Sequence, residues 1–116
     1  MTVQTEDLIV EEMKEWKEKL LLEQTERKEK LKELEFKLEV SNAKKHCLVQ
    51  VKYITDSRLG AQQDISNATY DQEVKRNEEL RTAIEVLKAA IHANDEVNKL
   101  IIYEIDKGIR ENEKNK

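Results

Sequence analysis

The chain contains no proline and only two glycines, Gly60 and Gly108, in 116 residues. Sandwiches and barrels need many turns, and turns draw on glycine, proline and asparagine. An α/β nucleotide-binding enzyme needs glycine-rich loops where the backbone approaches its ligand. With two glycines and no proline, the chain can supply neither the many turns nor the glycine-rich loops. Because 40% of its residues are charged and 38% are hydrophobic, the composition is instead that of long helices and coiled coils, and we expect an all-α protein.

The first long segment predicts a helix with one packing seam. Thr5 is suited to cap a helix, and from there to Val40 the chain has no glycine or proline and is rich in strong helix formers. Five of eight positions spaced alternately four and three residues apart are apolar, which is a coiled-coil pattern. These positions are Met13, Lys17, Leu20, Gln24, Arg27, Leu31, Leu34 and Leu38.

The middle of the chain, residues 41–68, is open to helix, loop or strand. Ser41 and Asn42 are poor residues for a helix interior and indicate a kink or a fresh cap. Residues 47–53 alternate like a strand, yet they also fit a helical face that includes Leu48. Length favours helix, because no turn residue interrupts the run before Gly60, which is expected in the left-handed conformation that ends helices. The polar segment 61–68 is predicted to be a loop.

The second long segment carries the strongest pattern. Thr69 and Gln72 have the spacing of a capping box, with Ser66 as an alternative cap. Six of eight positions with alternating four- and three-residue spacing are aliphatic, over three to four heptads. Gly108 is expected to start fraying, and residues 110–116 are expected to form a solvated tail. The eight positions are Leu80, Ile84, Leu87, Ile91, Asn94, Asn98, Ile101 and Ile105.

Two segments of nearly equal length around one loop predict a long antiparallel helical hairpin. Residues 1–60 form the first helix, with a possible kink near 41–42, residues 61–68 the connecting loop, and residues 69–116 the second helix. The alternative is a single rod that pairs in parallel. Because two helices have little interior and apolar residues also lie outside the seam, we expect a homodimer or a multi-helix bundle with another helical protein.

We predict that the partner interface follows the seams. Asn94 and Asn98 either fix the register as buried amides or face water. Trp16 either fills the core or anchors a partner. The predicted interface residues are Leu80, Ile84, Leu87, Ile91, Asn94, Asn98, Ile101, Ile105, Leu20, Leu31, Leu34, Leu38 and Trp16, with Leu48 as a further seam position.

Charge and residue types argue against several functions. The net charge is −4, so nucleic acid and anionic membrane surfaces are not expected partners. No apolar run approaches the ~20 residues that span a bilayer. The lone Cys47 cannot form an intrachain disulfide and indicates a reducing compartment, the cytoplasm or the nucleus.

Nor does the sequence contain a group of residues that predicts catalysis. Adjacent His46 and Cys47 point about 100° apart on a helix, and a zinc site needs three or four ligands. Carboxylate pairs such as Glu78–Glu79 need a partly dry, concave site to act as acid and base. We therefore expect no enzyme activity, no cofactor, no metal and no small-molecule substrate.

The predicted function is a non-enzymatic coiled-coil scaffold or assembly subunit that mediates protein–protein interaction. An alternative comes from layout: the chain length and the helix–middle–helix order are similar to those of the prefoldin family. That resemblance implies a holding chaperone with a small β assembly between two coiled-coil arms. It requires Cys47–Tyr53 and Ile65–Tyr70 to be strands.

Overall fold

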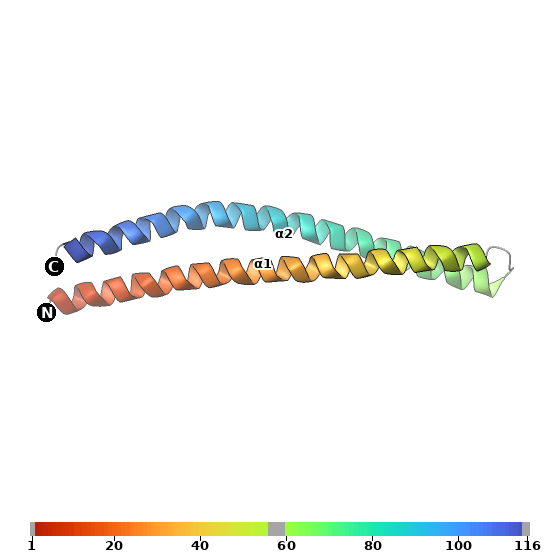
Figure 1. Cartoon of the computed structure of the whole chain (residues 1–116), viewed down its shortest axis with the longest axis horizontal. Coiled ribbons are helices and arrows are strands. Elements are labelled where there is room, and N and C mark those ends of the chain that lie inside the picture. The colour runs from red at the N-terminus through yellow and green to blue at the C-terminus, as the bar shows by residue number, and fades with distance from the viewer. Residues whose placement is uncertain (1, 56–59, 115–116) are drawn as a thin grey trace. The chain divides into compact units, whose positions relative to one another are not determined.

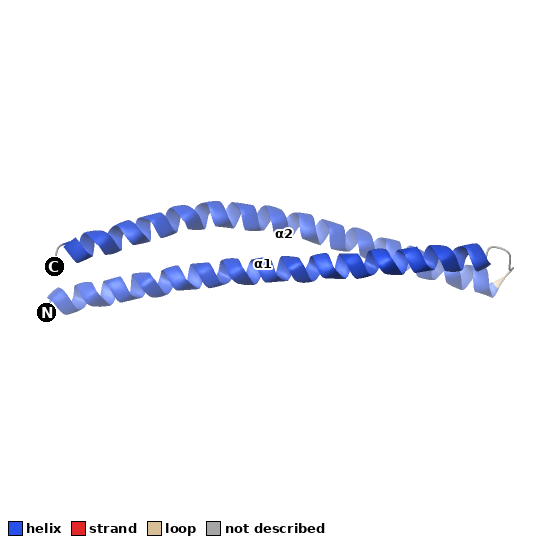
Figure 2. Cartoon of the chain, viewed as in Figure 1, coloured by secondary structure: helices blue, strands red, loops and turns tan. Residues whose placement is uncertain are grey.

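The computed structural model describes residues 2–55 and 60–114, with side chains from Thr5 onward, and this part of the chain is helical (Figures 1 and 2). Helix α1 spans Thr2–Thr55 and helix α2 spans Ala61–Lys114, each with 54 residues. The described residues contain no strand. The chain folds back as an antiparallel helical hairpin rather than running as one rod, so the all-α hairpin prediction is confirmed.

The hairpin divides into two compact units. The terminal unit contains Met1–Glu29 and Ala89–Lys116, and the turn unit contains Lys30–Lys88. In the terminal unit the first half of α1 lies beside the second half of α2. In the turn unit the second half of α1 lies beside the first half of α2. Each unit is thus a pair of antiparallel helical segments with one seam between them.

Side chains with reduced exposure recur along α1 at the predicted spacing. Val10, Ser41 and Thr55 are buried. The intervening seam positions are half-buried, and they continue the pattern without a break across the whole helix. The predicted phase of α1 is therefore correct. The half-buried positions are Met13, Lys17, Leu20, Gln24, Arg27, Leu31, Leu34, Leu38, Lys45, Leu48 and Lys52.

The predicted seam positions of α2 are also buried or half-buried, with one exception. Ile84, Asn98 and Ile105 are buried. Asn94 is exposed, and its side-chain amide donates to the carbonyl of Ala90, 2.7 Å away. Of the two asparagines left open by the sequence, Asn98 lies in the seam and Asn94 faces water. The half-buried seam positions are Leu80, Leu87, Ile91 and Ile101.

The structure differs from the prediction at the start of α2. Residues 61–68 are not a loop but the first two turns of this helix. Gly60 has the expected left-handed φ of 89°, and its carbonyl accepts the first helical hydrogen bond from the Asp64 amide, 3.2 Å away. Neither Thr69 nor Ser66 caps the helix: the Thr69 hydroxyl donates to the Ile65 carbonyl within the helix, and Ser66 is buried. The polar composition of residues 61–68 does not prevent a helix, because alanine and glutamine propagate a helix well.

Other predicted breaks are also helical. α1 begins at Thr2, so Thr5 lies inside it, and it continues through Ser41 and Asn42. α2 continues through Gly108 to Lys114, so residues 110–114 are helix rather than tail. The segments proposed as prefoldin-like strands, residues 47–53 and 65–70, are helical as well, which contradicts that requirement. The predicted helix end at residues 56–59 lies outside the described residues.

The two glycines are expected to respond oppositely to substitution by alanine. A Cβ atom would meet nothing within 4 Å at either position. The backbone conformation therefore decides whether alanine raises or lowers the free energy of unfolding. Gly60→Ala forces an L-residue to a φ of 89° and should destabilise the protein by about 1–2 kcal/mol. Gly108→Ala lies inside a helix and should stabilise it by about 0.5–1 kcal/mol. Urea unfolding followed by circular dichroism checks both, and equal signs would contradict these backbone assignments.

Candidate interaction surface

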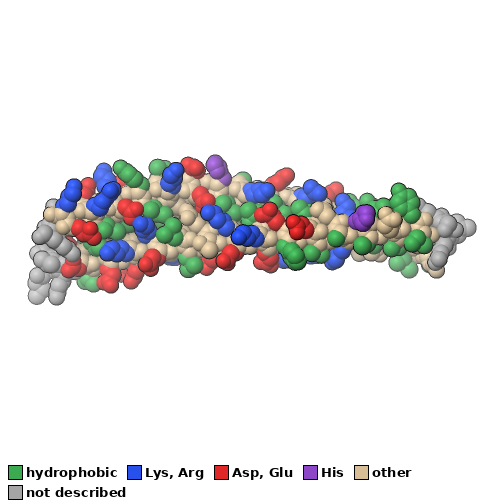
Figure 3. All heavy atoms as spheres, in the orientation of Figure 1, with side chains coloured by type: hydrophobic (Ala, Val, Ile, Leu, Met, Phe, Trp, Pro, Cys, Tyr) green, Lys and Arg blue, Asp and Glu red, His purple; other side chains and the backbone are tan. Residues whose placement is uncertain are grey.

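The hairpin has very little core of its own. Among the described hydrophobic residues only Val10, Ile84 and Ile105 are buried, whereas fifteen large hydrophobic side chains are exposed. Figure 3 shows apolar side chains lying between charged ones over the surface. Single exposed apolar residues are normal on a protein surface, so their arrangement on each unit decides whether they form a docking surface.

The residues predicted as a partner interface lie mostly along the chain's own seam. Leu20, Leu31, Leu34 and Leu38 of α1 have reduced exposure, as have all the predicted aliphatic positions of α2. In a two-helix unit, that burial comes from the other helix of the same chain. Asn94 lies outside the seam, and Trp16 is 45% exposed. Whether a second chain contacts any of these residues stays a prediction.

One side of the terminal unit contains an apolar groove of about 270 Å³. Ile9, Met13 and Trp16 of α1 line it, and α2 contributes Ile101 and Ile105. Gly108, Glu104 and Asn112 complete its wall. Because Gly108 has no side chain to fill the space, the groove remains open beside Trp16. We call this side, with Ile9, Trp16 and Glu104, the groove face of the terminal unit.

The other side of the terminal unit carries ion pairs between the helices. Lys17 Nζ lies 2.8 Å from Asp106 Oδ1, and Lys28 Nζ lies 4.0 Å from Asp95 Oδ2. Positions seven residues apart share one side of a helix in a coiled coil, so the heptad positions of Lys28 and Asp95 define this second side. We call it the ion-pair face.

The turn unit has the same two-sided organisation. One side contains an open groove of about 430 Å³ whose walls include Leu48, Val51, Ile65 and Thr69. Val51 is a whole number of heptads from Ile9 and Trp16, so this side is the groove face of the turn unit. On the opposite side, two seam residues reach outward, and the Lys52 ammonium lies 4.8 Å from the centre of the Tyr70 ring. Val49 lines the same opening, and it lies three heptads after Lys28 of the ion-pair face.

A buried polar cluster in the turn unit was missed by the sequence analysis. The amide nitrogen of Asn77 donates to Ser41 Oγ, 3.1 Å away, and to Asn42 Oδ1, 2.8 Å away. Arg81 Nε donates to Asn77 Oδ1 at 2.8 Å. Asn77 is 2% exposed and Ser41 is 1% exposed. Asn77 lies one heptad before Ile84 and Ser41 one heptad after Leu34, so extending both repeats would have placed them opposite each other.

The seam of the terminal unit also has a polar interruption, at the polar seam positions Gln24 and Arg27. Among the described residues, the buried Nε and Nη2 atoms of Arg27 have no hydrogen-bond partner, and neither has the buried Oδ1 of Asp95. Burying such groups unpaired costs free energy. We therefore expect this stretch to contribute less to stability than the aliphatic layers on either side.

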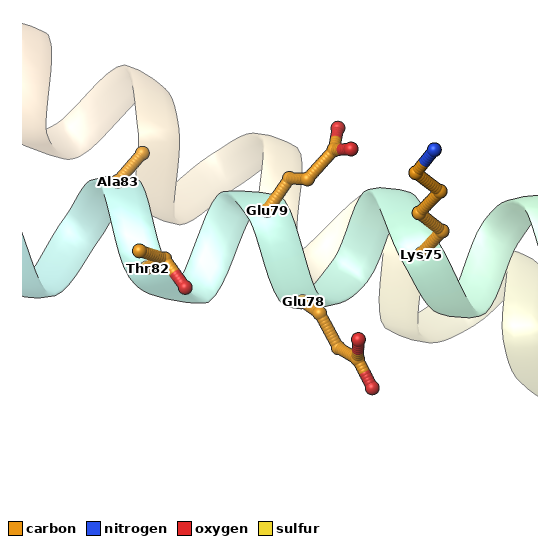
Figure 4. Close-up of a pocket in the computed structure, with 5 residues that line it drawn as sticks. All are labelled: Lys75, Glu78, Glu79, Thr82 and Ala83. Atoms are coloured by element: carbon orange, nitrogen blue, oxygen red, sulfur yellow. The ribbon is translucent and has the colours of Figure 1, made fainter.

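The residues considered for acid–base or metal chemistry lie on the outer surface of the helices. Figure 4 shows an open pocket lined by five side chains of α2 alone, where Glu78 and Glu79 point away from each other. His46, Cys47 and His92 are exposed. Among the described residues there is no group of three or more histidine, cysteine or acidic side chains that could hold a metal ion. In that same part of the chain, neither helix is long and apolar enough to cross a membrane.

The interhelical ion pair is expected to contribute little to stability. The Lys17 and Asp106 side chains are 34% and 43% exposed, so water screens their attraction. Asp106→Asn should lower the free energy of unfolding by about 0.2–1 kcal/mol, and added salt should shrink that difference. Urea unfolding at low and high salt measures the effect. A larger loss that is independent of salt would show that Asp106 acts through packing instead.

The architecture defines a class of protein, the antiparallel helical hairpin with coiled-coil spacing. Comparisons with protein families, curated proteins and solved structures find no match to this chain.

Proposed function

We propose that the protein is a non-enzymatic scaffold or assembly subunit that binds other helical chains, or further copies of itself, through heptad-spaced apolar side chains. The observation that carries this proposal is the imbalance between a minimal core and a large set of exposed apolar residues. A side chain such as Leu100, which is 68% exposed, gains about 1.5–3 kcal/mol when it is buried.

The geometry supports binding more than catalysis. The grooves on the groove faces are open, shallow and mainly apolar, and they lie between two helices. Such surfaces suit an added helix that supplies further ridges, as in three- and four-helix bundles. The holding-chaperone alternative requires strands at residues 47–53 and 65–70, and these residues are helical. We therefore propose the scaffold function alone. The single Cys47 supports the cytoplasm or the nucleus as the compartment.

Affinity capture with tagged chain tests this function. Wild-type chain should retain either specific proteins or untagged copies of itself. Trp16→Ser should lose them, because Trp16 lines the groove of the terminal unit. Glu15→Ser, the neighbouring exposed substitution, is the matched control and should retain them. Absence of any retained chain with the wild-type protein would contradict the proposed function.

A further inference from the structure

A second apolar stripe runs along α2 outside the seam. Its residues repeat at alternating three- and four-residue spacing, and none of the six is polar. All are exposed except the half-buried Ala90. Val97 lies one heptad before Glu104, which lines the groove of the terminal unit, so the stripe belongs to the groove faces. Its members are Ala83 and Val86 in the turn unit, and Ala90, Ala93, Val97 and Leu100 in the terminal unit.

The groove faces of the two units carry opposite charge. We count the described residues at the heptad positions of Ile9 and Glu12 in α1, and of Glu104 and Lys107 in α2, as the groove faces. Among them, the terminal unit has more carboxylates than lysines, and the turn unit has more basic than acidic groups. The groove face of one unit is therefore electrostatically complementary to that of the other. The charged residues are Glu12, Glu23, Glu26, Glu104 and Glu111 with Lys19, Lys107 and Lys114 in the terminal unit, and Lys30, Lys37, Lys44 and Arg76 with Glu33 and Glu79 in the turn unit.

The ion-pair faces lack this complementarity. Among the described residues at the heptad positions of Glu11 and Lys28 in α1, and of Asp95 and Asp106 in α2, six acidic residues outnumber three basic ones in each unit. Two such faces would therefore repel each other. In the terminal unit these are Asp7, Glu11, Glu18, Asp95, Asp106 and Glu113 with Lys14, Lys28 and Lys99. In the turn unit they are Glu35, Glu39, Asp64, Asp71, Glu78 and Glu85 with Lys32, Arg81 and Lys88.

The stripe is also complementary to itself in shape. When two α2 helices are placed antiparallel, one register puts all six apolar positions of each stripe opposite the other. Ala83 then faces Leu100 of the second copy, Val86 faces Val97, and Ala90 faces Ala93. Small side chains meet large ones at the ends, and equal ones meet near the middle, which permits close packing. A two-fold axis generates this pairing, as in most homodimers.

We propose that a second copy of this chain docks on the groove faces, with the two α2 stripes packed antiparallel. The terminal unit of each copy then meets the turn unit of the other, acidic groove face against basic groove face. This inference rests on the proposed function and assigns its partner, its surface and its register.

Sedimentation equilibrium over a range of concentrations tests the docking. Wild-type chain should approach twice its mass of 13.7 kDa. Val97→Glu should raise the dissociation constant by about a hundredfold or more, because each dimer would bury two unpaired carboxylates in the stripe. His92→Glu is the matched control: it is exposed, adds the same charge, lies outside the stripe, and should leave the dissociation constant unchanged. Circular dichroism should show equal helix content in all three chains.

Disulfide pairing tests the register in a Cys47→Ser background. A mixture of Ala90→Cys and Ala93→Cys chains should form mixed disulfide dimers. A mixture of Glu85→Cys and Lys99→Cys chains should not form them. These two positions lie on the ion-pair face, and the midpoint between them along α2 is close to the midpoint between positions 90 and 93. Monomer at every concentration, a dimer as sensitive to His92→Glu as to Val97→Glu, or equal cross-linking of both mixtures would overturn the inference. The affinity capture described above would still decide the proposed function, because a monomer can retain other proteins.

Discussion

Ile84→Ala should destabilise the hairpin by about 2 kcal/mol, measured as a lower urea midpoint in circular dichroism at fixed protein concentration. Ile84 is 6% exposed and is one of three buried apolar residues among the described positions. Its truncation removes transfer free energy and leaves a cavity, which together cost about 2–5 kcal/mol in a large core. A seam between two helices relaxes and admits water more easily, so we expect the low end of that range.

Phe36→Ala is the control for this prediction. It removes a larger apolar side chain from the same unit, but Phe36 is 65% exposed. Its effect should stay within about 0.5 kcal/mol. Equal losses for the two substitutions would contradict the assignment of Ile84 to the seam and Phe36 to the outer surface.

Asn77→Ala should cost about 1–3 kcal/mol, because it leaves the buried Ser41 hydroxyl without its partner. Asn42 and Arg81 are exposed, so both can turn to water and add little to the loss. The matched control is Asn94→Ala. That asparagine is exposed and bonds only within its own helix, so its replacement should be neutral or slightly stabilising through helix propensity.

A double-mutant cycle with Ser41→Ala isolates the hydrogen bond. Once Asn77 is alanine, removal of the Ser41 hydroxyl should cost little, because no buried polar group is then left unsatisfied. A coupling free energy of about 1 kcal/mol is expected. Strict additivity of the two substitutions would show that Asn77 and Ser41 do not interact in solution.

The sequence predicted the helical class and the phase of both seams because a 3.5-residue repeat leaves few alternatives in a chain without proline. It failed where polar residues occupy structured positions. Residues 61–68 have the composition of a loop because asparagine, serine and aspartate favour turns, yet Ser66 is buried in the seam. Ser41 looked like a kink because its partner, Asn77, lies far along the chain and hydrophobic periodicity ignores hydrogen-bond pairing.

The assignment of surfaces could not be predicted from the sequence. Leu87 and Val86 are adjacent, and each belongs to an apolar repeat of the same period. Only closure of the hairpin decides which repeat is used within the chain. Val97 and Leu100 of the second repeat are 54% and 68% exposed. The candidate docking surface therefore follows from the structure and not from periodicity alone.

The central claim is that the strict seam closes within one chain and leaves the second stripe for a partner. It is tested most directly by cross-linking Lys17→Cys/Asp106→Cys, in a Cys47→Ser background, with a short bismaleimide. Light and heavy isotope-labelled chains are mixed, unfolded, refolded and then cross-linked. Because Lys17 and Asp106 form an interhelical ion pair at 2.8 Å, we expect cross-linked peptides between positions 17 and 106 that are all light–light or all heavy–heavy. Mixed-isotope links, or links between position 17 of two chains, would show that the seam forms between chains and would contradict the account.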